Sequence, residues 1–173
     1  LWSIINFRWD LILFLKKSGY EIQVIATDEN FFDPKLSVFN DINIKPVILP
    51  IERSKFNPFR DGIFFLRILR TFRRLSPDIA MLFTIKPNIY GSLACRLLRI
   101  PFINTISGLG SGLIHENLKS RFIRILYSVS LKGSCKVLFQ NSSDNEYFIN
   151  RKIIKREQTA CVPGAGIDVE KFK

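Results

Sequence analysis

Short apolar segments alternate with longer amphipathic segments along the whole chain, and this alternation restricts the fold more than any other feature. Residues 78–84, for example, form a short apolar run that is typical of a parallel strand covered on both faces. Further strands are expected at 21–26, 43–49, 102–106, 135–140 and 159–162, and helices at 58–75, 88–98, 118–131 and 142–152. Strand and helix repeated in this way predict an α/β fold with a doubly wound parallel sheet.

The ends of two predicted helices are marked by capping and helix-breaking residues. Asn6 is placed to cap the first helix, which Gly19 would end. Asn57 is placed to cap the long helix that follows it, and Pro77 to stop that helix. Residues 31–40 are compatible with a short helix.

Length and composition fit one folded domain over residues 1–173. Hydrophobic residues make up 47% of the chain and charged residues 24%, which is enough apolar material for one compact core. The chain starts at Leu1 without a strand before its first helix and stops at Lys173 just after a glycine-rich loop, so we expect both ends to be cuts in a larger protein. Because the first strand of the common Rossmann order lies in the middle of the sheet, this sheet is expected to lack a central strand.

The chain is strongly basic, with 26 Lys and Arg against 15 Asp and Glu and a formal net charge of +11. Such an excess attracts nucleic acid, phosphorylated substrates or an anionic lipid surface; the alternative is that it serves solubility alone. The basic residues fall on predicted helices, and the chain does not show the arrangement of aromatic residues on strands that an RNA-binding sheet uses. We therefore expect no nucleic-acid partner.

The predicted helix 58–75 is both aromatic and basic. Phe65, Leu69 and Phe72 share one face, and another face carries Arg60, Arg67, Arg70 and Arg74. This pattern suits an anionic membrane interface, and it suits equally a helix that packs on a sheet and exposes a solvated basic face. A second helix repeats the theme with Lys119, Arg121 and Arg124. No apolar run approaches the roughly 18 residues of a membrane span, so we expect peripheral contact with a membrane.

The cysteine and histidine content argues against disulfides and metals. Cys95, Cys135 and Cys161 are odd in number, have no Cys-x-x-Cys spacing and fall in apolar stretches. We expect three buried thiols in a reducing compartment. With one histidine in the chain, a zinc site is not expected, and no cofactor motif is evident.

Polar and glycine residues collect after the predicted strands. In an open parallel sheet, ligands bind beyond the carboxyl ends of the strands, where glycines let the backbone approach a ligand and helix N-termini favour anions. The candidates for substrate binding in these positions are Lys86, Asn88, Ser107, Gly108, Gly110, Gly164, Gly166 and Asp168.

Each of these features has a simpler interpretation. The glycines from Gly108 to Gly112 could form only a flexible loop, and Lys86 could be a solvated surface lysine. Asn141 and Ser142 are best explained as caps of the helix that follows them. His115 is our candidate for a catalytic role, because the neighbouring Glu116 would keep it suited to proton or hydroxyl chemistry; the alternative is a surface pair.

Together these motifs resemble the N-terminal domain of GT-B glycosyltransferases of family four. The likeness is strongest to bacterial enzymes that extend undecaprenyl-diphosphate-linked sugars during glycan assembly. It spans nearly the whole chain, and its most specific part is the Gly-x-Gly-Ile-Asp-x-x-x-Phe ending at 164–172. The other matching segments are 2–3, 6–8, 19–21, 24–26, 86–91 and 104–110.

The resemblance implies a reaction and its partners. A hexosyl or N-acetylhexosaminyl group would move from a nucleotide-diphosphate sugar such as a UDP-sugar to a polyprenyl-diphosphate-linked saccharide, with retention of configuration and without a metal. The enzyme would sit peripherally on the cytoplasmic face of the inner membrane. The N-terminal domain would hold the acceptor. Donor chemistry would lie in a C-terminal domain that this chain lacks, so we expect the fragment alone to be inactive.

The resemblance also suggests roles for residues. Arg8, with Asn6 in the same motif, and Lys86 become candidates for phosphate contacts, and the glycines at 108 and 110 would allow close approach of the sugar. The segment 164–168 would flank the cleft between domains. Many members place a histidine after the fifth strand; Ser107 holds that position in this chain, and His115 follows eight residues later.

Two other classes of function remain in view. The chain could be a non-catalytic, membrane-associated subunit that binds the acceptor and recruits a separate donor-binding chain. A dinucleotide-dependent oxidoreductase is less favoured, because no glycine fingerprint with a distal acidic residue is present.

Overall fold

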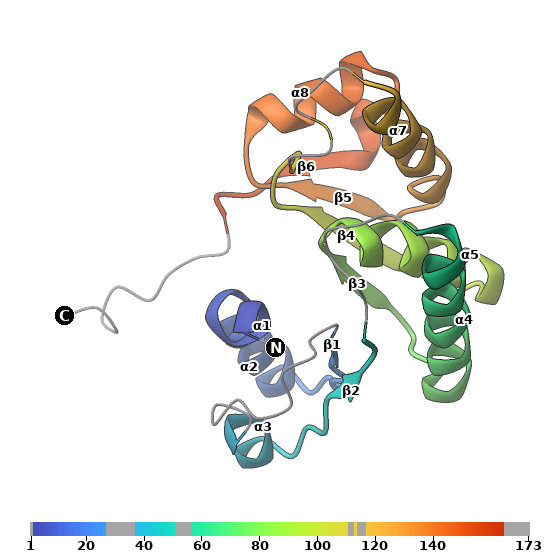
Figure 1. Cartoon of the computed structure of the whole chain (residues 1–173). Coiled ribbons are helices and arrows are strands. Elements are labelled where there is room, and N and C mark those ends of the chain that lie inside the picture. Colours follow the sequence, from blue (N-terminus) through green and yellow to red (C-terminus); the bar gives the residue numbers. More distant parts are fainter. Residues whose placement is uncertain (1, 27–36, 51–56, 111–112, 114–116, 165–173) are drawn as a thin grey trace. The chain divides into compact units, whose positions relative to one another are not determined.

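The computed structural model describes residues 2–26, 37–50, 57–110, 113 and 117–164 (Figure 1). The chain divides into two compact units, one of Leu1–Phe64 with Ala165–Lys173 and one of Phe65–Gly164. Each unit has its own parallel sheet.

The first unit packs three short helices around a pair of parallel strands. Its elements are α1 (Trp2–Phe7), α2 (Trp9–Lys17), β1 (Ile25–Ala26), α3 (Ser37–Asp41) and β2 (Val47–Ile48). Strand β1 pairs with β2 in parallel, with Ile25 opposite Val47. The core is formed by Ile12, Val24, Ala26, Phe39 and Ile44, and the ring of Trp9 meets that of Phe39 edge-on at 5.2 Å.

The first helix was predicted at the correct place in the chain, but it is divided in two and its cap differs from the prediction. The structure has two helices that are separated at Arg8, where φ is −134° and ψ is −2°. Asn6 lies inside α1 and caps neither helix. Gly19 follows the end of α2 with a φ of +90°, as expected of a glycine that stops a helix. The strands expected at 21–26 and 43–49 shorten to two residues each.

Helix α4 (Pro58–Leu75) has the predicted bounds and the predicted cap. The Asn57 Oδ1 atom accepts hydrogen bonds from the backbone N–H groups of Phe59 and Arg60, at 3.1 and 3.2 Å. In return, the carboxylate of Asp61 accepts from the backbone N–H of Asn57 at 3.2 Å. Side chains therefore satisfy donors that the first turn would otherwise leave without partners.

The second unit is built on a four-stranded parallel sheet in the order β3-β4-β5-β6 (Figure 1). Its elements are β3 (Ala80–Phe83), η2 (Pro87–Gly91), α5 (Ser92–Leu98), β4 (Phe102–Ile106), α7 (Leu118–Ser130), β5 (Lys136–Phe139), α8 (Ser142–Asn150), η3 (Arg156–Gln158) and β6 (Thr159–Cys161). The predicted α/β fold with parallel strands is confirmed. Among the described strands, β1–β2 and β3–β6 form separate sheets, whereas one sheet was expected from the sequence.

The core of this unit includes a cluster of aromatic rings. Phe148 of α8 makes edge-on contacts with Phe139 of β5 and Tyr127 of α7, with ring centroids 5.2 and 5.3 Å apart. All three side chains are buried. Burial of each such side chain contributes about 1.5–3 kcal/mol, so the cluster helps to hold α7, α8 and β5 together.

The prediction of three buried thiols is correct only for Cys95. Cys135 and Cys161 are exposed, and all three are free thiols. Cys135 lies just before β5, and Cys161 is the last residue of the edge strand β6. An apolar sequence context therefore did not determine which of the three thiols is buried.

Candidate functional site

The carboxyl ends of β3, β4 and β5 come together at one edge of the four-stranded sheet. Phe83 is in register with Thr105, and Thr105 with Leu138, so the loops that follow these strands begin side by side. The backbone N–H of Val162, after β6, donates to the carbonyl of Phe139 at 2.8 Å and extends this edge. We call this edge the rim. It contains the loops that begin at Thr84, Ser107, Gln140 and Val162.

Thr84, the first residue of the rim, has an unusual backbone conformation. Its φ is 67°, in the left-handed region that β-branched residues rarely enter. Its carbonyl accepts a hydrogen bond from the backbone N–H of Asn88 at 2.9 Å. Such a conformation costs about 1–3 kcal/mol and occurs often at functional sites. Sequence reasoning missed Thr84, because no local pattern distinguishes it from an ordinary strand end.

Lys86 is buried, with 5% of its surface exposed. The interpretation of Lys86 as a solvated surface lysine is therefore wrong. It precedes the first residue of η2 and has helical dihedral angles, with φ of −70° and ψ of −44°. Lysines are rarely buried to this extent unless they are paired, and Lys86 does interact with other groups of the protein.

Asn88 is fully enclosed and makes several hydrogen bonds. Its Nδ2 donates to the carbonyl of Thr105 at 3.0 Å, and its Oδ1 accepts from Nδ2 of Asn104 at 3.0 Å. The same Nδ2 of Asn104 also donates to Ser92 Oγ at 2.9 Å. Asn88 hydrogen bonds with Tyr127 as well; burial raises the pKa of the Tyr127 hydroxyl well above its ordinary value, and this hydrogen bond offsets part of the rise. The Asn88 side chain thus connects η2 with β4.

The segment 88–98 is helical, as predicted, and its first turn after Lys86 is a π-helix. Residues Pro87–Gly91 form η2, and the α-helix α5 begins only at Ser92. The turn packs closely on β3: a Cβ atom at Gly91 would come within 2.8 Å of Leu82 Cδ2. Single turns of π-helix are rare in proteins overall, and those that occur are often found at functional sites.

The glycines of the rim differ in backbone conformation and in the space around them. Gly110 has a φ of +63°, and a Cβ atom there would lie 3.0 Å from Ile85 Cδ1. Gly108 has open space around it, and Gly164 has open space with a φ of +69°. Ser107, which precedes Gly108 in the chain, is exposed. The loop after β4 therefore approaches the loop after β3 at Gly110.

The loop after β5 contains a helix cap, as predicted for Asn141. Its Oδ1 accepts from the backbone N–H of Asp144 at 2.7 Å, and its Nδ2 donates to the Asp144 carboxylate at 2.9 Å. Ser142 is the first residue inside α8 rather than a cap. The expectation of a capping role is thus correct for Asn141 and wrong for Ser142.

Several predicted site residues are not among the described residues of the second unit. Asn6 and Arg8 belong to the first unit, whereas the rim belongs to the second. Arg8 Nη1 donates to the carbonyl of Phe7 at 2.7 Å, and partial burial lowers the pKa of its guanidinium. His115, Gly166 and Asp168 lie outside the described residues.

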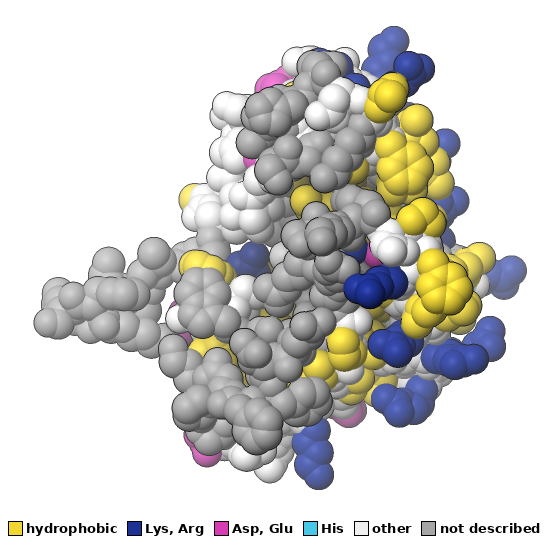
Figure 2. Space-filling model, in the orientation of Figure 1, with side chains coloured by type: hydrophobic (Ala, Val, Ile, Leu, Met, Phe, Trp, Pro, Cys, Tyr) yellow, Lys and Arg dark blue, Asp and Glu magenta, His cyan; other side chains and the backbone are white. Residues whose placement is uncertain are grey.

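Helix α4 exposes its arginines together with apolar side chains. Arg60, Arg67, Arg70 and Arg74 are all exposed. The buried side of the helix includes Phe64, Ile68 and Phe72. Of the apolar face expected from the sequence, Phe72 is thus buried and Phe65 and Leu69 are only partly buried. Phe59, Ile63 and Leu66 are exposed, and Figure 2 shows hydrophobic and basic side chains side by side over α4.

Within the part of the chain that the structure describes, no helix has the length and apolar character needed to cross a membrane. The described residues also contain no cluster of His, Cys, Asp or Glu side chains that could hold a metal ion.

Solved structures of known proteins share this fold. Acinetobacter baumannii MurG matches with a TM-score of 0.60 at 15% identity, over 95% of this chain and 42% of that protein. A glycosyltransferase from Rickettsia africae matches with a TM-score of 0.61 at 15% identity, over 92% and 38%. The UDP-GlcNAc 2-epimerase of Neisseria meningitidis, solved with UDP-GlcNAc, matches with a TM-score of 0.59 at 14% identity, over 87% and 42%.

Sequence comparison gives a more specific likeness. The chain is 27% identical over 175 residues to the N,N'-diacetylbacillosaminyl-diphospho-undecaprenol alpha-1,3-N-acetylgalactosaminyltransferase of Campylobacter jejuni, and the match covers 98% of this chain and 45% of that enzyme. The chain thus spans less than half the length of this relative. The family described as glycosyl transferase 4-like matches residues 3–141, which include η2 and the strands from β1 to β5. The chain therefore belongs to the glycosyl transferase 4-like family, a GT-B type of glycosyltransferase.

Proposed function

We propose that the protein containing this chain transfers a hexosyl or N-acetylhexosaminyl group from a nucleotide-diphosphate sugar to a polyprenyl-diphosphate-linked saccharide. Family membership and the printed activity of the Campylobacter relative, which acts on a diphospho-undecaprenol-linked sugar, both support it. The observation that carries the proposal is the rim. A buried lysine, a strained threonine and a glycine loop meet there, at the edge of the sheet where such folds bind ligands.

We assign residues 1–173 to the acceptor side of the reaction. Lys86 would act on the acceptor diphosphate: a positive charge removed from water interacts more strongly with an anion than a solvated one does. Ser107 and Gly108, both exposed, would lie along the sugar, and Gly110 would fix their loop. Asn88 would position Lys86 through its hydrogen bonds to β4. Arg8, Asn6, Gly164, Gly166, Asp168 and His115 stay candidates for substrate contact or catalysis.

Transfer would retain the anomeric configuration and would need the donor-binding part of the protein. Because the electrostatic stabilisation of a diphosphate leaving group is a large share of catalysis, the acceptor side alone is expected to be inactive. The chain matches only 45% of the length of its Campylobacter relative, which leaves room in such an enzyme for a second domain.

The protein would work at the cytoplasmic face of the inner membrane and bind it peripherally. The exposed arginines of α4 lie among exposed apolar side chains, a combination suited to anionic headgroups.

The test is a transfer assay on the full-length protein. It would be incubated with UDP-N-acetylgalactosamine, UDP-N-acetylglucosamine, UDP-galactose or UDP-glucose and a short-chain polyprenyl-diphosphate sugar, with product detected by mass spectrometry. We expect transfer from at least one donor. Lys86→Met keeps an unbranched side chain that is one atom shorter and removes the ammonium group. It should lower kcat/KM by about 100-fold while circular dichroism stays unchanged.

The matched control is Lys132→Met, which removes an exposed lysine from the loop after α7 and should keep full activity. If the protein transferred sugar from none of these donors, the enzymatic proposal would be contradicted. Transfer that arises only after addition of a co-purifying second chain would favour the non-catalytic subunit instead. Full activity in folded Lys86→Met would remove Lys86 from the site.

A further inference from the structure

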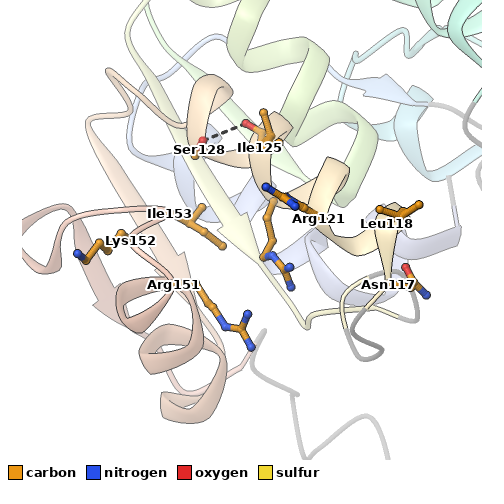
Figure 3. Close-up of a pocket in the computed structure, with 9 residues that line it drawn as sticks. Asn117, Leu118, Arg121, Ile125, Ser128, Arg151, Lys152 and Ile153 are labelled. Atoms are coloured by element: carbon orange, nitrogen blue, oxygen red, sulfur yellow. Dashed lines mark hydrogen bonds between the residues drawn. The ribbon is translucent and has the colours of Figure 1, made fainter.

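A basic groove lies in the second unit between α7 and the residues that follow α8 (Figure 3). Its volume is about 750 Å³, enough for a polar headgroup. Arg121, Arg124, Leu118 and Ile125 of α7 contribute to one side, and Arg151 and Lys152 to the other. The lining thus holds four cationic side chains, and none of the described lining residues is acidic. A groove of this composition is suited to an anion.

Tyr147 organises two of the four cations. Arg124 Nη1 donates to the Tyr147 hydroxyl at 3.2 Å, and the guanidinium carbon of Arg151 lies 5.5 Å from the centre of the Tyr147 ring. The same hydroxyl donates to the carbonyl of Leu113 at 3.4 Å. One side chain therefore holds both guanidinium groups, so part of the ordering that binding requires is already present in the fold.

The outer side of α7 is apolar and open to solvent. Leu118 is 85% exposed, Phe122 53%, Ile125 54% and Val129 44%. Their spacing of four, three and four residues places them in one stripe along the helix, opposite a buried side that includes Ile123 and Tyr127. Figure 2 shows hydrophobic side chains next to basic ones over α7. The stripe and the groove share Leu118 and Ile125.

We propose that this groove binds the phosphate headgroup of an anionic glycerophospholipid while the stripe of α7 lies in the acyl boundary of the bilayer. Arginine guanidinium groups pair with phosphate oxygens in two-point hydrogen bonds, and four of the described lining residues are cationic. A phosphate ion in solution would contact only the cations and leave the apolar stripe exposed to water. An anionic lipid uses both, and this favours the bilayer as the occupant.

The inference rests on the membrane attachment proposed above and names a second surface and a ligand for it, but it does not depend on sugar transfer. The test is co-sedimentation of the full-length protein with vesicles of phosphatidylcholine, alone or mixed with phosphatidylglycerol. Binding should require phosphatidylglycerol. The variant Arg121→Gln/Lys152→Gln removes two exposed cations of the groove and spares the pair held by Tyr147; it should weaken binding about tenfold or more.

The matched control, Lys132→Gln/Lys155→Gln, removes the same charge from exposed lysines outside the groove lining and should bind as the wild type does. Phe122→Ser/Ile125→Ser should weaken vesicle binding while the protein stays folded. An equal loss in the control, or equal binding to phosphatidylcholine alone, would overturn the site. Binding of inorganic phosphate that Arg121→Gln/Lys152→Gln abolishes, with no loss of vesicle binding in that variant, would instead identify a site for phosphate in solution and overturn the lipid assignment.

Transfer to a water-soluble, short-chain acceptor separates this inference from the proposed function. Wild type and Arg121→Gln/Lys152→Gln should transfer at equal rates, because the lipid site is not needed for a soluble substrate. Loss of soluble transfer in the variant would instead place these cations in substrate binding and contradict the lipid assignment. A wild type that binds vesicles and transfers nothing would contradict only the proposed function.

Discussion

The side-chain amide of Asn104, in the middle of β4, donates to Oδ1 of Asn88, in the π-helical turn η2, across 3.0 Å. Both side chains are fully buried, and Asn104 donates to Ser92 as well. Asn104→Leu should therefore leave buried acceptors without their partner. We expect it to lower the free energy of unfolding by about 1–3 kcal/mol, measured by urea denaturation.

A double-mutant cycle tests whether these two residues act as a pair. Asn88→Leu/Asn104→Leu should cost less than the sum of the single changes, because each single change strands a polar group that the double change removes. The exposed Asn150 at the end of α8 provides the control, since Asn150→Leu should change the stability by less than about 0.5 kcal/mol. Additive single effects would show that the pair does not act as a unit.

Gly110 and Gly108 stand two residues apart in the same rim loop and should respond differently to alanine. Gly110 has a φ of +63° and lies against Ile85, whereas a Cβ at Gly108 meets nothing within 4 Å. Gly110→Ala should lower the free energy of unfolding by about 1–2 kcal/mol, and Gly108→Ala should leave it nearly unchanged. Thermal denaturation of both variants gives the comparison. Equal stability would mean that the loop is merely flexible.

The three thiols should differ in reactivity. Burial raises the pKa of Cys95 to about 12, whereas Cys135 and Cys161 are exposed. Because the thiolate is the reacting form, a disulfide reagent in mildly alkaline buffer should titrate two thiols quickly in the folded protein and the third only after unfolding. Cys95→Ala should remove the slow thiol alone. Rapid reaction of all three would contradict the packing around Cys95.

The sequence identified features that local chemistry determines. The strand at 102–106 and the Asn57 cap of α4 both lie where they were expected, because an apolar run between turn residues and an asparagine before a helix carry their signal locally. The order of strands and helices likewise predicted parallel pairing and a common rim for the loops after β3, β4 and β5.

The features that sequence reasoning missed depend on packing between distant segments. From the sequence, we expected Lys86 to be solvated or to contact a phosphate. Its burial depends on other parts of the chain that pack over the start of η2, and the residues next to Lys86 do not reveal them. The π-helical turn fits the close contact between Gly91 and Leu82 on β3, which no local pattern reveals. The buried side of α4 includes Phe64 and Ile68 because helical periodicity allows several apolar faces and tertiary contacts select one.

The ion pair between α8 and η3 gives a prediction for pH dependence. Arg156 donates from Nη1 and Nη2 to the two carboxylate oxygens of Glu146 at 2.8 and 2.9 Å, and this hydrogen bonding lowers the pKa of the Glu146 carboxyl in the folded state. The pair therefore stabilises the fold above the unfolded pKa of glutamate, about 4.3, and its contribution is lost as the pH falls from that value through the lowered folded one. Both side chains are exposed, so the effect should be small and should weaken in salt. Glu146→Gln should lower Tm slightly at neutral pH and leave it unchanged in strong acid. The control is Glu157→Gln, which changes an exposed glutamate outside the pair. If Glu146→Gln lowered Tm equally at both pH values, the carboxylate charge would not be the cause.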